Sequence, residues 1–387
     1  MHKYLKISKD TSKILFLFLF WRLLLIIVGI FAVRYIPLAH QDRFLGGGPN
    51  NYRIFPEFFS WANFDGEHYL SIAIFGYKAL EHAFFPIYPM IIYFFSHLFS
   101  SNLLESIVNS VLVGIYISNI SFIFALILLF ELIKIDFSRK ISFLTLVVLL
   151  IFPTSFYFGS LYNESLFLLL SVLSFYFARK GKWRFASLFG LLSSATRVFG
   201  ILLLPALLIE AYQQRISIKK VLWLFMIPFG LGAYMVYQYI NVGDPLAFYH
   251  LQKIVGEQHQ SGVISLPQVY FRYIKMVLTV DITNPIYQTI WLEFLIGLAF
   301  LILPIYGYFK KIRLSYIFYA MVGFLLPTIQ GSFSSLPRYI LILFPSFLAL
   351  AIFFNSLPKI IKLLFVVACS SVLIVEASMF LRGYWVA

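Results

Sequence analysis

Charged residues are scarce in this sequence. Asp, Glu, Lys and Arg make up 12% of its 387 residues, about half of the roughly 25% that soluble domains carry, while 61% are hydrophobic and the mean hydropathy is +0.88. A water-soluble core could not bury this much apolar surface, so we expect lipid to be the solvent for most of the chain. Cysteine is nearly absent, and the single Cys369 excludes a disulfide framework.

Negative charge is rarer than positive charge, and the formal net charge is +14. The basic residues form short clusters between apolar runs, as the positive-inside rule requires of cytoplasmic loops. Their placement in cytoplasmic loops accounts for the excess of positive charge without a polyanionic partner, so we predict no nucleic-acid binding. Lys3, Lys6, Lys9 and Lys13 precede the first apolar run and predict a cytoplasmic N-terminus.

Apolar runs of about 20 residues, the length that spans a bilayer, recur along the chain. Threading them so that every basic cluster falls inside predicts about eleven transmembrane helices in one domain, residues 1–387, with external loops at about 37–107 and 241–285. The segment 84–99 has no flanking basic residues and contains Pro86 and Pro89. We therefore expect a juxtamembrane or re-entrant helix there, in an otherwise all-α polytopic membrane protein.

The first external loop is unusually acidic. Five of the chain's 16 acids fall between Asp42 and Glu81. Asp65 is placed to cap a helix that begins at Gly66, because its oxygen can accept free backbone N–H groups. One interpretation is a cap with solvated neighbours. Because aromatic residues crowd these acids, the other is a carboxylate in dry surroundings, which can have a raised pKa and act as a base.

The same loop carries the most specific motif of the chain. It reads Asp65-Gly-Glu-His-Tyr-Leu-Ser-Ile-Ala-Ile-Phe-Gly-Tyr77, followed by Ala83-Phe-Phe-Pro-Ile-Tyr-Pro89. Weaker motifs follow in order: Pro153-Thr-Ser-Phe-Tyr157, Tyr162-Asn-Glu-Ser-Leu-Phe167, Ala195-Thr-Arg-Val-Phe-Gly200, Gly243-Asp-Pro-Leu-Ala-Phe248 and Ser335-Leu-Pro-Arg-Tyr339. Together they resemble the PIG-V type mannosyltransferases, the second mannosyltransferases of GPI-anchor assembly and their prokaryotic relatives. Val198 departs from the family, which often has proline there.

The resemblance implies a GT-C fold and the transfer of a hexose, mannose in this family, from a polyprenyl- or dolichyl-phosphate sugar. In that class an acid of the first external loop is the catalytic residue, here Asp65, and a second acid lies in the next external loop, here Glu164. The acceptor would be a lipid-linked glycan or another molecule at the outer face of the membrane, and the displacement would be inverting. We expect a bacterial or archaeal cytoplasmic membrane, or the ER membrane in a eukaryote.

Arginines at the outer ends of predicted spans are candidates for binding the lipid phosphate, because a guanidinium can bond two phosphate oxygens at once. Arg338 and Arg197 are the first candidates and Arg272 is a weaker one. The alternative for Arg338 and Arg197 is a membrane anchor, and the alternative for Arg272 is a surface helix.

Glu67 and His68 follow Asp65 closely, and His68 is spaced to share a helix face with it. We expect both to orient the acceptor or Asp65, and Glu164 to hydrogen-bond sugar hydroxyls. A carboxylate–histidine pair could also ligate a metal, but dedicated metal sites use more ligands at tighter spacing. We therefore predict no obligatory metal, with a divalent cation as the alternative.

A different class of function is a polytopic transporter, or a lipid or glycolipid flippase that performs no glycosyl transfer. Such a protein would carry ionisable residues near the membrane midplane and two related halves with broken helices. The sequence shows neither clearly, and we expect its acids to gather outside the membrane. Arg22 is an ionisable residue inside the first predicted span, where we expect it to snorkel or to pair with another helix.

Overall fold

The structure is a computed structural model that describes residues 8–39, 44–251, 264–284 and 286–386. Within these ranges the chain forms helices and no β-strand. Lys3, Lys6, Asp42 and the middle of the second predicted external loop lie outside the described residues.

The α-helices and 3-10 helices (η) follow one another along the chain as α1 (Lys9–Tyr35), α2 (Gly48–Ile54), α3 (Pro56–Phe59), η1 (Ser60–Ala62), α4 (Asp65–Phe75), η2 (Ala79–Ala83), α5 (Ile87–His97), α6 (Leu103–Ile133), α7 (Arg139–Leu150), η3 (Ser155–Gly159), α8 (Glu164–Arg179), α9 (Trp183–Ser194), η4 (Val198–Leu202), α10 (Leu203–Gln213), α11 (Ile218–Val221), η5 (Leu222–Met226), α12 (Ile227–Val242), α13 (Ala247–His250), α15 (Leu266–Thr279), α16 (Ile286–Phe309), α17 (Leu314–Thr328), α18 (Leu336–Tyr339), η6 (Ile340–Ile342), α19 (Phe344–Ser356) and α20 (Lys359–Leu381).

Five described helices are long and apolar enough to cross a membrane: α1, α6, α16, α20 and the continuous stretch Ile218–Val242. A sixth candidate is broken, because Leu336–Ile342 and Phe344–Ser356 meet at 91°. Two other expected spans are shorter apolar helices, Val198–Gln213 and α17 with 15 residues. The chain is thus an all-helical, multi-pass membrane protein, and the count of about eleven spans stays a prediction.

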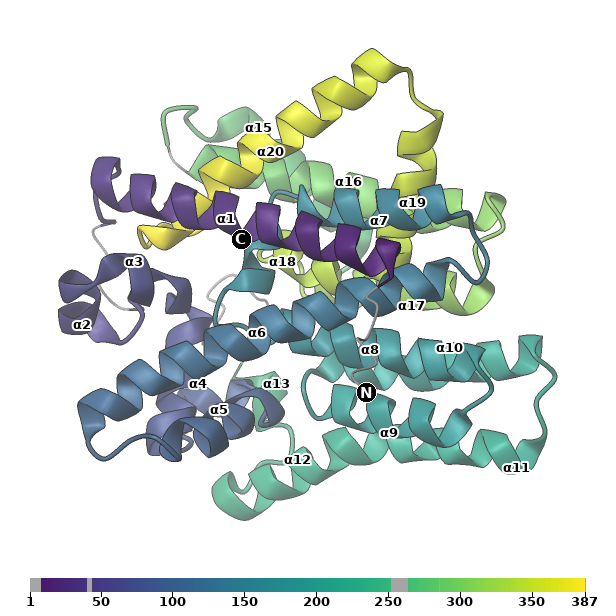
Figure 1. The fold of residues 1–387 in the computed structure, drawn as a ribbon, viewed down its shortest axis with the longest axis horizontal. Helices are drawn as coiled ribbons and strands as arrows, with labels where there is room; N and C mark the ends of the chain where they lie inside the picture. Colours follow the sequence, from purple (N-terminus) through teal and green to yellow (C-terminus); the bar gives the residue numbers. More distant parts are fainter. Residues whose placement is uncertain (1–7, 40–43, 252–263, 285, 387) are drawn as a thin grey trace, which may run out of the picture.

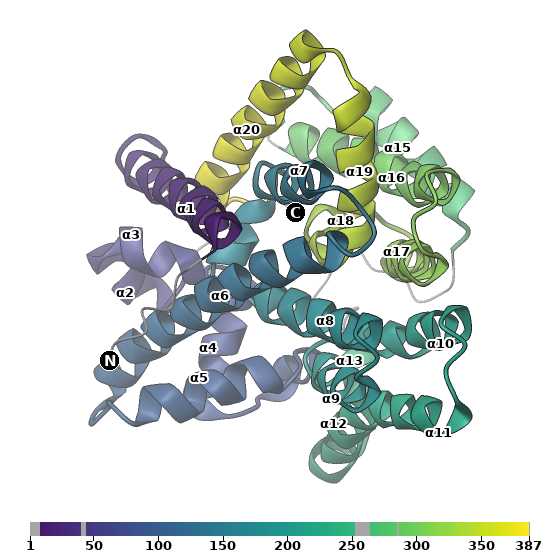
Figure 2. The same ribbon diagram turned by 45° about the vertical axis from the view of Figure 1, so that its right-hand side comes forward.

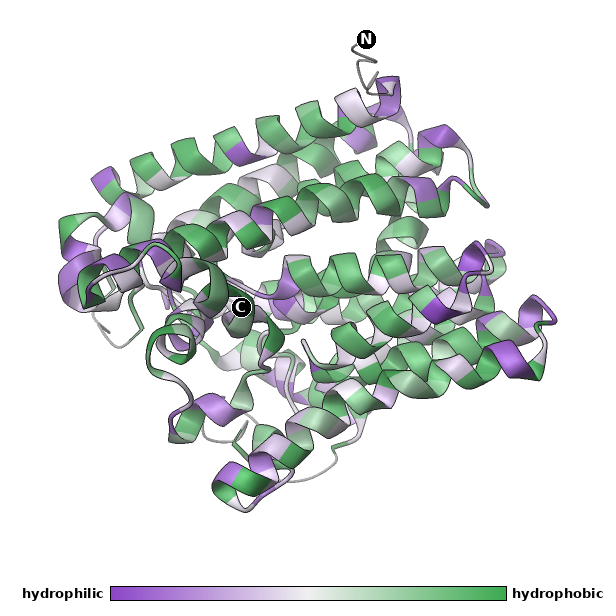
Figure 3. Ribbon diagram, turned by 60° about the horizontal axis from the view of Figure 1, so that its bottom comes forward, coloured by the Kyte–Doolittle hydropathy of each residue, from purple (hydrophilic) through white to green (hydrophobic). Residues whose placement is uncertain are grey.

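The outward faces of the long helices are apolar. On α1, Phe16 is 68% exposed and Phe20 is 62% exposed, whereas Trp21 and Leu25 are buried against the bundle. Figure 3 shows hydrophobic residues along the middles of the helices and hydrophilic residues gathered toward their ends. Such a surface suits hydrocarbon with polar headgroups on either side.

Most long helices lie side by side, and α2 to α5 gather at one side of the bundle (Figures 1 and 2). Helix α6 packs against α5, α7 and α8, and α1 packs against α20. Helix α5 has 11 residues. At 1.5 Å per residue it is about 16 Å long, too short for a hydrocarbon core of about 30 Å. It agrees with the short helix expected at 84–99.

Four charged side chains of alternating sign join the turns at one end of the bundle. Arg179, the last residue of α8, pairs with Asp136, and its Nε lies 3.3 Å from Oε1 of Glu210 in α10. Arg313, just before α17, places Nη2 2.8 Å from the same oxygen. Glu210 is fully buried, and a buried charge is tolerated only when it is paired. The cluster therefore fixes the ends of α8, α10 and α17 relative to one another.

Three ionisable residues lie within candidate spans, the half-buried Arg22 and two buried acids. The Arg22 guanidinium of α1 stacks on the ring of Trp61 in η1, 4.2 Å from its centroid. This contact gives Arg22 a packing partner on another helical element, one of the two alternatives expected for it. Glu293 of α16 and Glu376 of α20 are also buried. These two acids therefore lie in helices and not in the two predicted external loops.

Candidate active site

Asp65 is the first residue of α4, and the backbone before it is held in an unusual conformation. Phe64 has φ 57° and ψ −118°, a region that a non-glycine residue occupies only where its surroundings impose it. The buried Asn63 supplies that restraint: its Oδ1 accepts the Gly46 N–H at 2.9 Å, and its Nδ2 donates to the Phe380 carbonyl at 3.0 Å. The start of α4 is therefore tied to the loop before it and to α20.

The predicted helix cap is wrong. Asp65 lies inside α4 rather than before it, and in the described part of the chain no side chain caps this helix. Its carboxylate turns instead to Arg338 of α18, whose Nη1 donates to Oδ2 at 2.5 Å. Asp65 and Arg338 are 273 positions apart, so this pairing is set by the tertiary fold.

Two more predicted site residues complete the cluster. Arg338 Nε lies 3.7 Å from Oε1 of Glu164, the first residue of α8. The same oxygen accepts a 2.7 Å hydrogen bond from Nη1 of Arg197, which precedes η4. Asp65, Arg338, Glu164 and Arg197 thus form a line of alternating charges, which we call the acid–arginine array. Its formal charges cancel.

The acid–arginine array is largely shielded, but its members differ in exposure. The Asp65 side chain is 23% exposed, whereas those of Arg338, Arg197 and Glu164 are 8%, 11% and 2% exposed. Aromatic rings form the walls, and the Arg338 guanidinium lies 5.1 to 5.7 Å from the ring centroids of Tyr157, Tyr162 and Tyr339. Asp65 is therefore the more accessible of the two carboxylates, and Glu164 is enclosed.

Two polar neighbours of the array lie in the quoted motifs without having been singled out. Asn163 accepts from Arg197 Nη1 at 3.1 Å and donates to the Thr196 carbonyl at 3.0 Å. The Tyr162 hydroxyl donates to the Asn63 carbonyl at 2.9 Å. These bonds connect the start of α8 with the turn before η4 and the start of α4. Tyr162 and Asn163 directly precede Glu164 in the chain, and this position is what could have marked them as site residues.

Glu67 and His68 lie on α4 but are not members of the array. Glu67 Oε2 accepts the Gly47 N–H at 2.7 Å. The His68 ring stacks on Phe84, with centroids 4.7 Å apart, and tilts against Phe44. Burial lowers the pKa of His68, although the nearby Asp65 charge acts in the opposite direction. His68 is therefore favoured as a neutral ring beside Asp65.

Glu67 gives the site a pH dependence. Burial raises the pKa of Glu67 from 4.5 to about 7, and hydrogen bonds from Gly47 and Gly48 only partly oppose it. The folded protein then binds this proton more tightly than the unfolded chain does. The contribution to stability is therefore complete below pH 4.5 and is lost as the pH rises through 7.

We expect Glu67→Gln, which stays neutral, to stabilise the protein in detergent more at pH 8 than at pH 5, by a difference of about 2 kcal/mol. The measurement is thermal unfolding of both proteins at the two pH values. An equal change in unfolding temperature at pH 5 and pH 8 would show that Glu67 does not titrate in this range.

Arg272 does not join the array. It lies on α15, and its Nη1 donates to the Gly331 carbonyl at 3.0 Å, at the turn that precedes α18. Among the predicted site residues, the structure therefore brings together Asp65, Glu164, Arg197 and Arg338.

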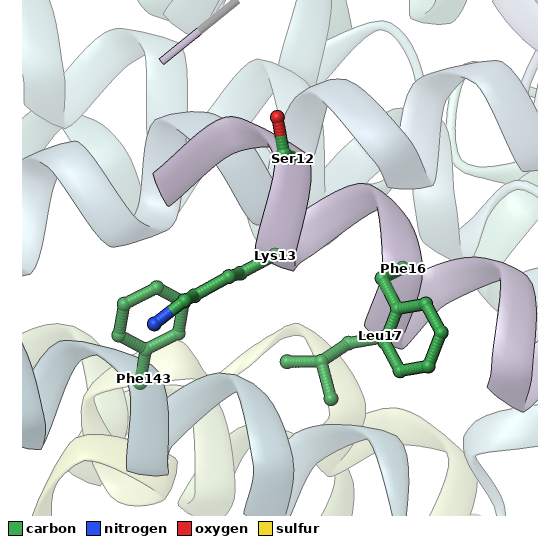
Figure 4. Close-up of a pocket in the computed structure, with 5 residues that line it drawn as sticks. All are labelled: Ser12, Lys13, Phe16, Leu17 and Phe143. Carbon is green, nitrogen blue, oxygen red and sulfur yellow. The ribbon is translucent and has the colours of Figure 1, made fainter. Parts of the chain in front are cut away.

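A separate apolar pocket of about 350 Å³ lies near the N-terminal end of α1 (Figure 4), and no residue of the array lines it. Its lining consists of Ser12, Lys13, Phe16, Leu17 and Phe143. Asp10, one turn earlier in α1, pairs with Arg139 at the start of α7.

Among the residues that the structure describes, no three His, Cys, Asp or Glu side chains are grouped to hold a metal ion. That no metal is obligatory, with a divalent cation as the alternative, stays a prediction.

Two structures of the Archaeoglobus fulgidus oligosaccharyltransferase align with this chain at 12% sequence identity. The apo form aligns over 100% of this chain with a TM-score of 0.46, and the form tethered by a disulfide to an acceptor peptide with the NVT sequon aligns over 94% with 0.43. This chain spans 57% and 55% of the length of those two chains. TM-scores of 0.46 and 0.43 do not establish a shared fold or a shared activity. Comparison with curated protein sequences finds no significant match.

The sequence profile of the family described as Mannosyltransferase (PIG-V) matches residues 48–249, just over half of the 387-residue chain. The matched region contains Asp65, Glu164 and Arg197, and Arg338 lies beyond it. The resemblance seen in the motifs is confirmed: this chain belongs to the PIG-V mannosyltransferase family.

Proposed function

We propose that this protein transfers a hexose, mannose by family, from a polyprenyl- or dolichyl-phosphate sugar to a hydroxyl of a lipid-linked glycan or another acceptor. The reaction would take place at the external face of the membrane, in a GT-C arrangement. The observation that carries the proposal is the acid–arginine array, which joins a reachable carboxylate to two shielded guanidinium groups.

The reaction needs a base, and Asp65 is the better of the two acids for that role. The acceptor oxygen forms a bond to the anomeric carbon while the bond from that carbon to the phosphate oxygen breaks. The acceptor proton passes to the Asp65 carboxylate, and the polyprenyl phosphate leaves with the bonding electron pair. Glu164 is only 2% exposed and already bonded to Arg197, which favours a role in holding the arginines.

Arg338 and Arg197 are assigned to the phosphate. A guanidinium in a shielded site stabilises the charge that develops on a leaving phosphate more strongly than one in water does. In the structure, Arg338 is bonded to Asp65. We propose that the donor phosphate takes the place of Asp65 on Arg338. The carboxylate is then freed to accept the proton only after the donor has bound.

The positions of charge along the helices support the external location. Helix α8 begins at Glu164 in the array and ends at Arg179 in the opposite ionic cluster. The turns at the Arg179 end also contain Lys180, Lys182 and Lys311, and basic turns favour the cytoplasmic side. The array would then face outward, in a cytoplasmic membrane of a bacterium or archaeon, or the ER membrane of a eukaryote.

The experiment is a transfer assay with the purified protein in lipid nanodiscs, using polyprenyl-phosphate mannose and extracted membrane glycolipids. We expect mannose to reach the acceptor with its anomeric configuration inverted. Transfer from a nucleotide sugar instead, or with retained configuration, would refute the proposed donor or mechanism.

A further inference from the structure

Side chains from two other elements hold the turn before Arg338. Glu293 of α16 uses one carboxylate oxygen to accept the Tyr273 hydroxyl at 2.6 Å and the other to accept the Ser335 N–H at 3.2 Å. The Tyr273 oxygen in turn accepts the Phe333 N–H at 3.1 Å. Both side chains are buried. The pair of Tyr273 and Glu293 therefore holds the turn at two backbone N–H groups, those of Phe333 and Ser335.

This turn sets the direction of α18. Ser335 has φ 60°, in the left-handed region that a non-glycine residue adopts only when its surroundings hold it there. Its carbonyl accepts the N–H groups of Arg338 and Tyr339 at 3.1 and 3.0 Å. The orientation of the short helix that carries Arg338 thus depends on the conformation of Ser335.

Helix α15, in the second predicted external loop, provides the rest of the support. It packs against α16 (Figure 2), and its Arg272 holds the Gly331 carbonyl at the beginning of the turn. Among the described residues, no hydrogen bond or ion pair links Tyr273 or Glu293 to a side chain of the array. They can act on it only through the backbone.

We propose that Tyr273 and Glu293 are positioning residues, which lock the turn 332–335 and so set Arg338 where the donor phosphate binds. This rests on the proposed function. The pair is sensitive to loss of the Tyr273 hydroxyl, because that hydroxyl gives its only proton to Glu293 and accepts the Phe333 N–H. Phenylalanine at position 273 would leave the Phe333 N–H and one Glu293 oxygen without these partners.

The test compares Tyr273→Phe with Tyr270→Phe in nanodiscs, measuring affinity for decaprenyl monophosphate. Tyr270 lies on the same helix, but its hydroxyl donates to the Gly297 carbonyl at 2.8 Å, away from the turn backbone. We expect Tyr273→Phe to bind the probe about tenfold more weakly, the factor for one lost buried hydrogen bond. Tyr270→Phe, which loses the same kind of hydroxyl, should bind like the wild type.

Glu293→Gln provides a second variant with Tyr273 intact, and we expect it to weaken binding as well. Arg338→Met serves as the reference for lost phosphate binding. If Arg338→Met weakens binding while Tyr273→Phe and Glu293→Gln do not, the positioning role is refuted and the proposed function stands. Equal weakening by Tyr273→Phe and Tyr270→Phe would assign the effect to general loosening of α15 and also refute it. No effect of Arg338→Met would refute both the positioning role and the phosphate assignment.

Discussion

Asp65→Asn is expected to abolish glycosyl transfer while the protein remains folded. The amide cannot take the proton of the acceptor hydroxyl, and general-base catalysis contributes about 10²- to 10⁴-fold to a rate. The change is nearly isosteric, and the Asp65 side chain is the most exposed of the array. The measurement is the turnover rate with a polyprenyl-phosphate sugar, with the unfolding temperature followed in parallel.

Asp281→Asn is the matched control. Asp281 belongs to the second predicted external loop, where its Oδ1 accepts the Thr283 N–H at 2.8 Å, and it has no contact with the array among the described residues. Its variant should transfer sugar at the wild-type rate. Turnover by Asp65→Asn within a few fold of the wild type would remove Asp65 from the chemistry.

Arg338→Met is expected to weaken donor binding by at least about 10²-fold. Each hydrogen bond to a charged group contributes about 1.5–3 kcal/mol, and a guanidinium makes two with one phosphate. Arg338→Lys should be nearly as severe, because Arg338 reaches Asp65 through Nη1 while its Nε faces Glu164. A lysine has only one nitrogen to offer. Isothermal titration with a polyprenyl phosphate measures both variants.

The control for Arg338 is another arginine of the same end of the molecule. Arg382 follows α20 and donates to the Ile36 carbonyl at 2.8 Å and the Tyr52 hydroxyl at 3.3 Å. Arg382→Met should keep the affinity for the donor. If Arg338→Met also kept it, the phosphate would have to bind elsewhere.

Much of the architecture could be predicted from the sequence, because lipid imposes a strong pattern on it. Continuous apolar runs predict helices, and prolines at positions 86 and 89 predict the short α5. The broken helix at 336–356 was expected as one span, and Pro345, directly after the turn at Leu343 that bends it by 91°, was the local signal for the break. The shorter helices likewise cannot be counted as spans by length, because they fall short of the roughly 20 residues that cross a bilayer.

The identities of the array residues were predictable, and their pairing was not. Asp65, Glu164, Arg197 and Arg338 each lie in a quoted motif at the end of a predicted helix, so their chemistry could be read locally. Their contacts join positions 33 to 273 residues apart, which no spacing rule predicts. The cap assigned to Asp65 failed for the same reason: a distant arginine offers the carboxylate a stronger, charge-assisted bond.

Glu293 and Glu376 show a second limit of the sequence. Each of these acids lies in an apolar run that predicts a membrane span. The sequence alone does not name the residue that such an acid would pair with. In the structure, Glu293 is matched by a tyrosine hydroxyl and a backbone N–H rather than by a cation. Intramembrane acids alone would also suit a transporter, and the family membership favours sugar transfer.

The most direct test is the affinity of Asp65→Asn for decaprenyl monophosphate in nanodiscs. If Arg338 exchanges its carboxylate partner for the phosphate of the donor, then removing the charge at position 65 frees the guanidinium. The account predicts that the inactive variant binds the phosphate about tenfold more tightly than the wild type, since one competing charged hydrogen bond is gone. Unchanged or weaker binding would contradict it.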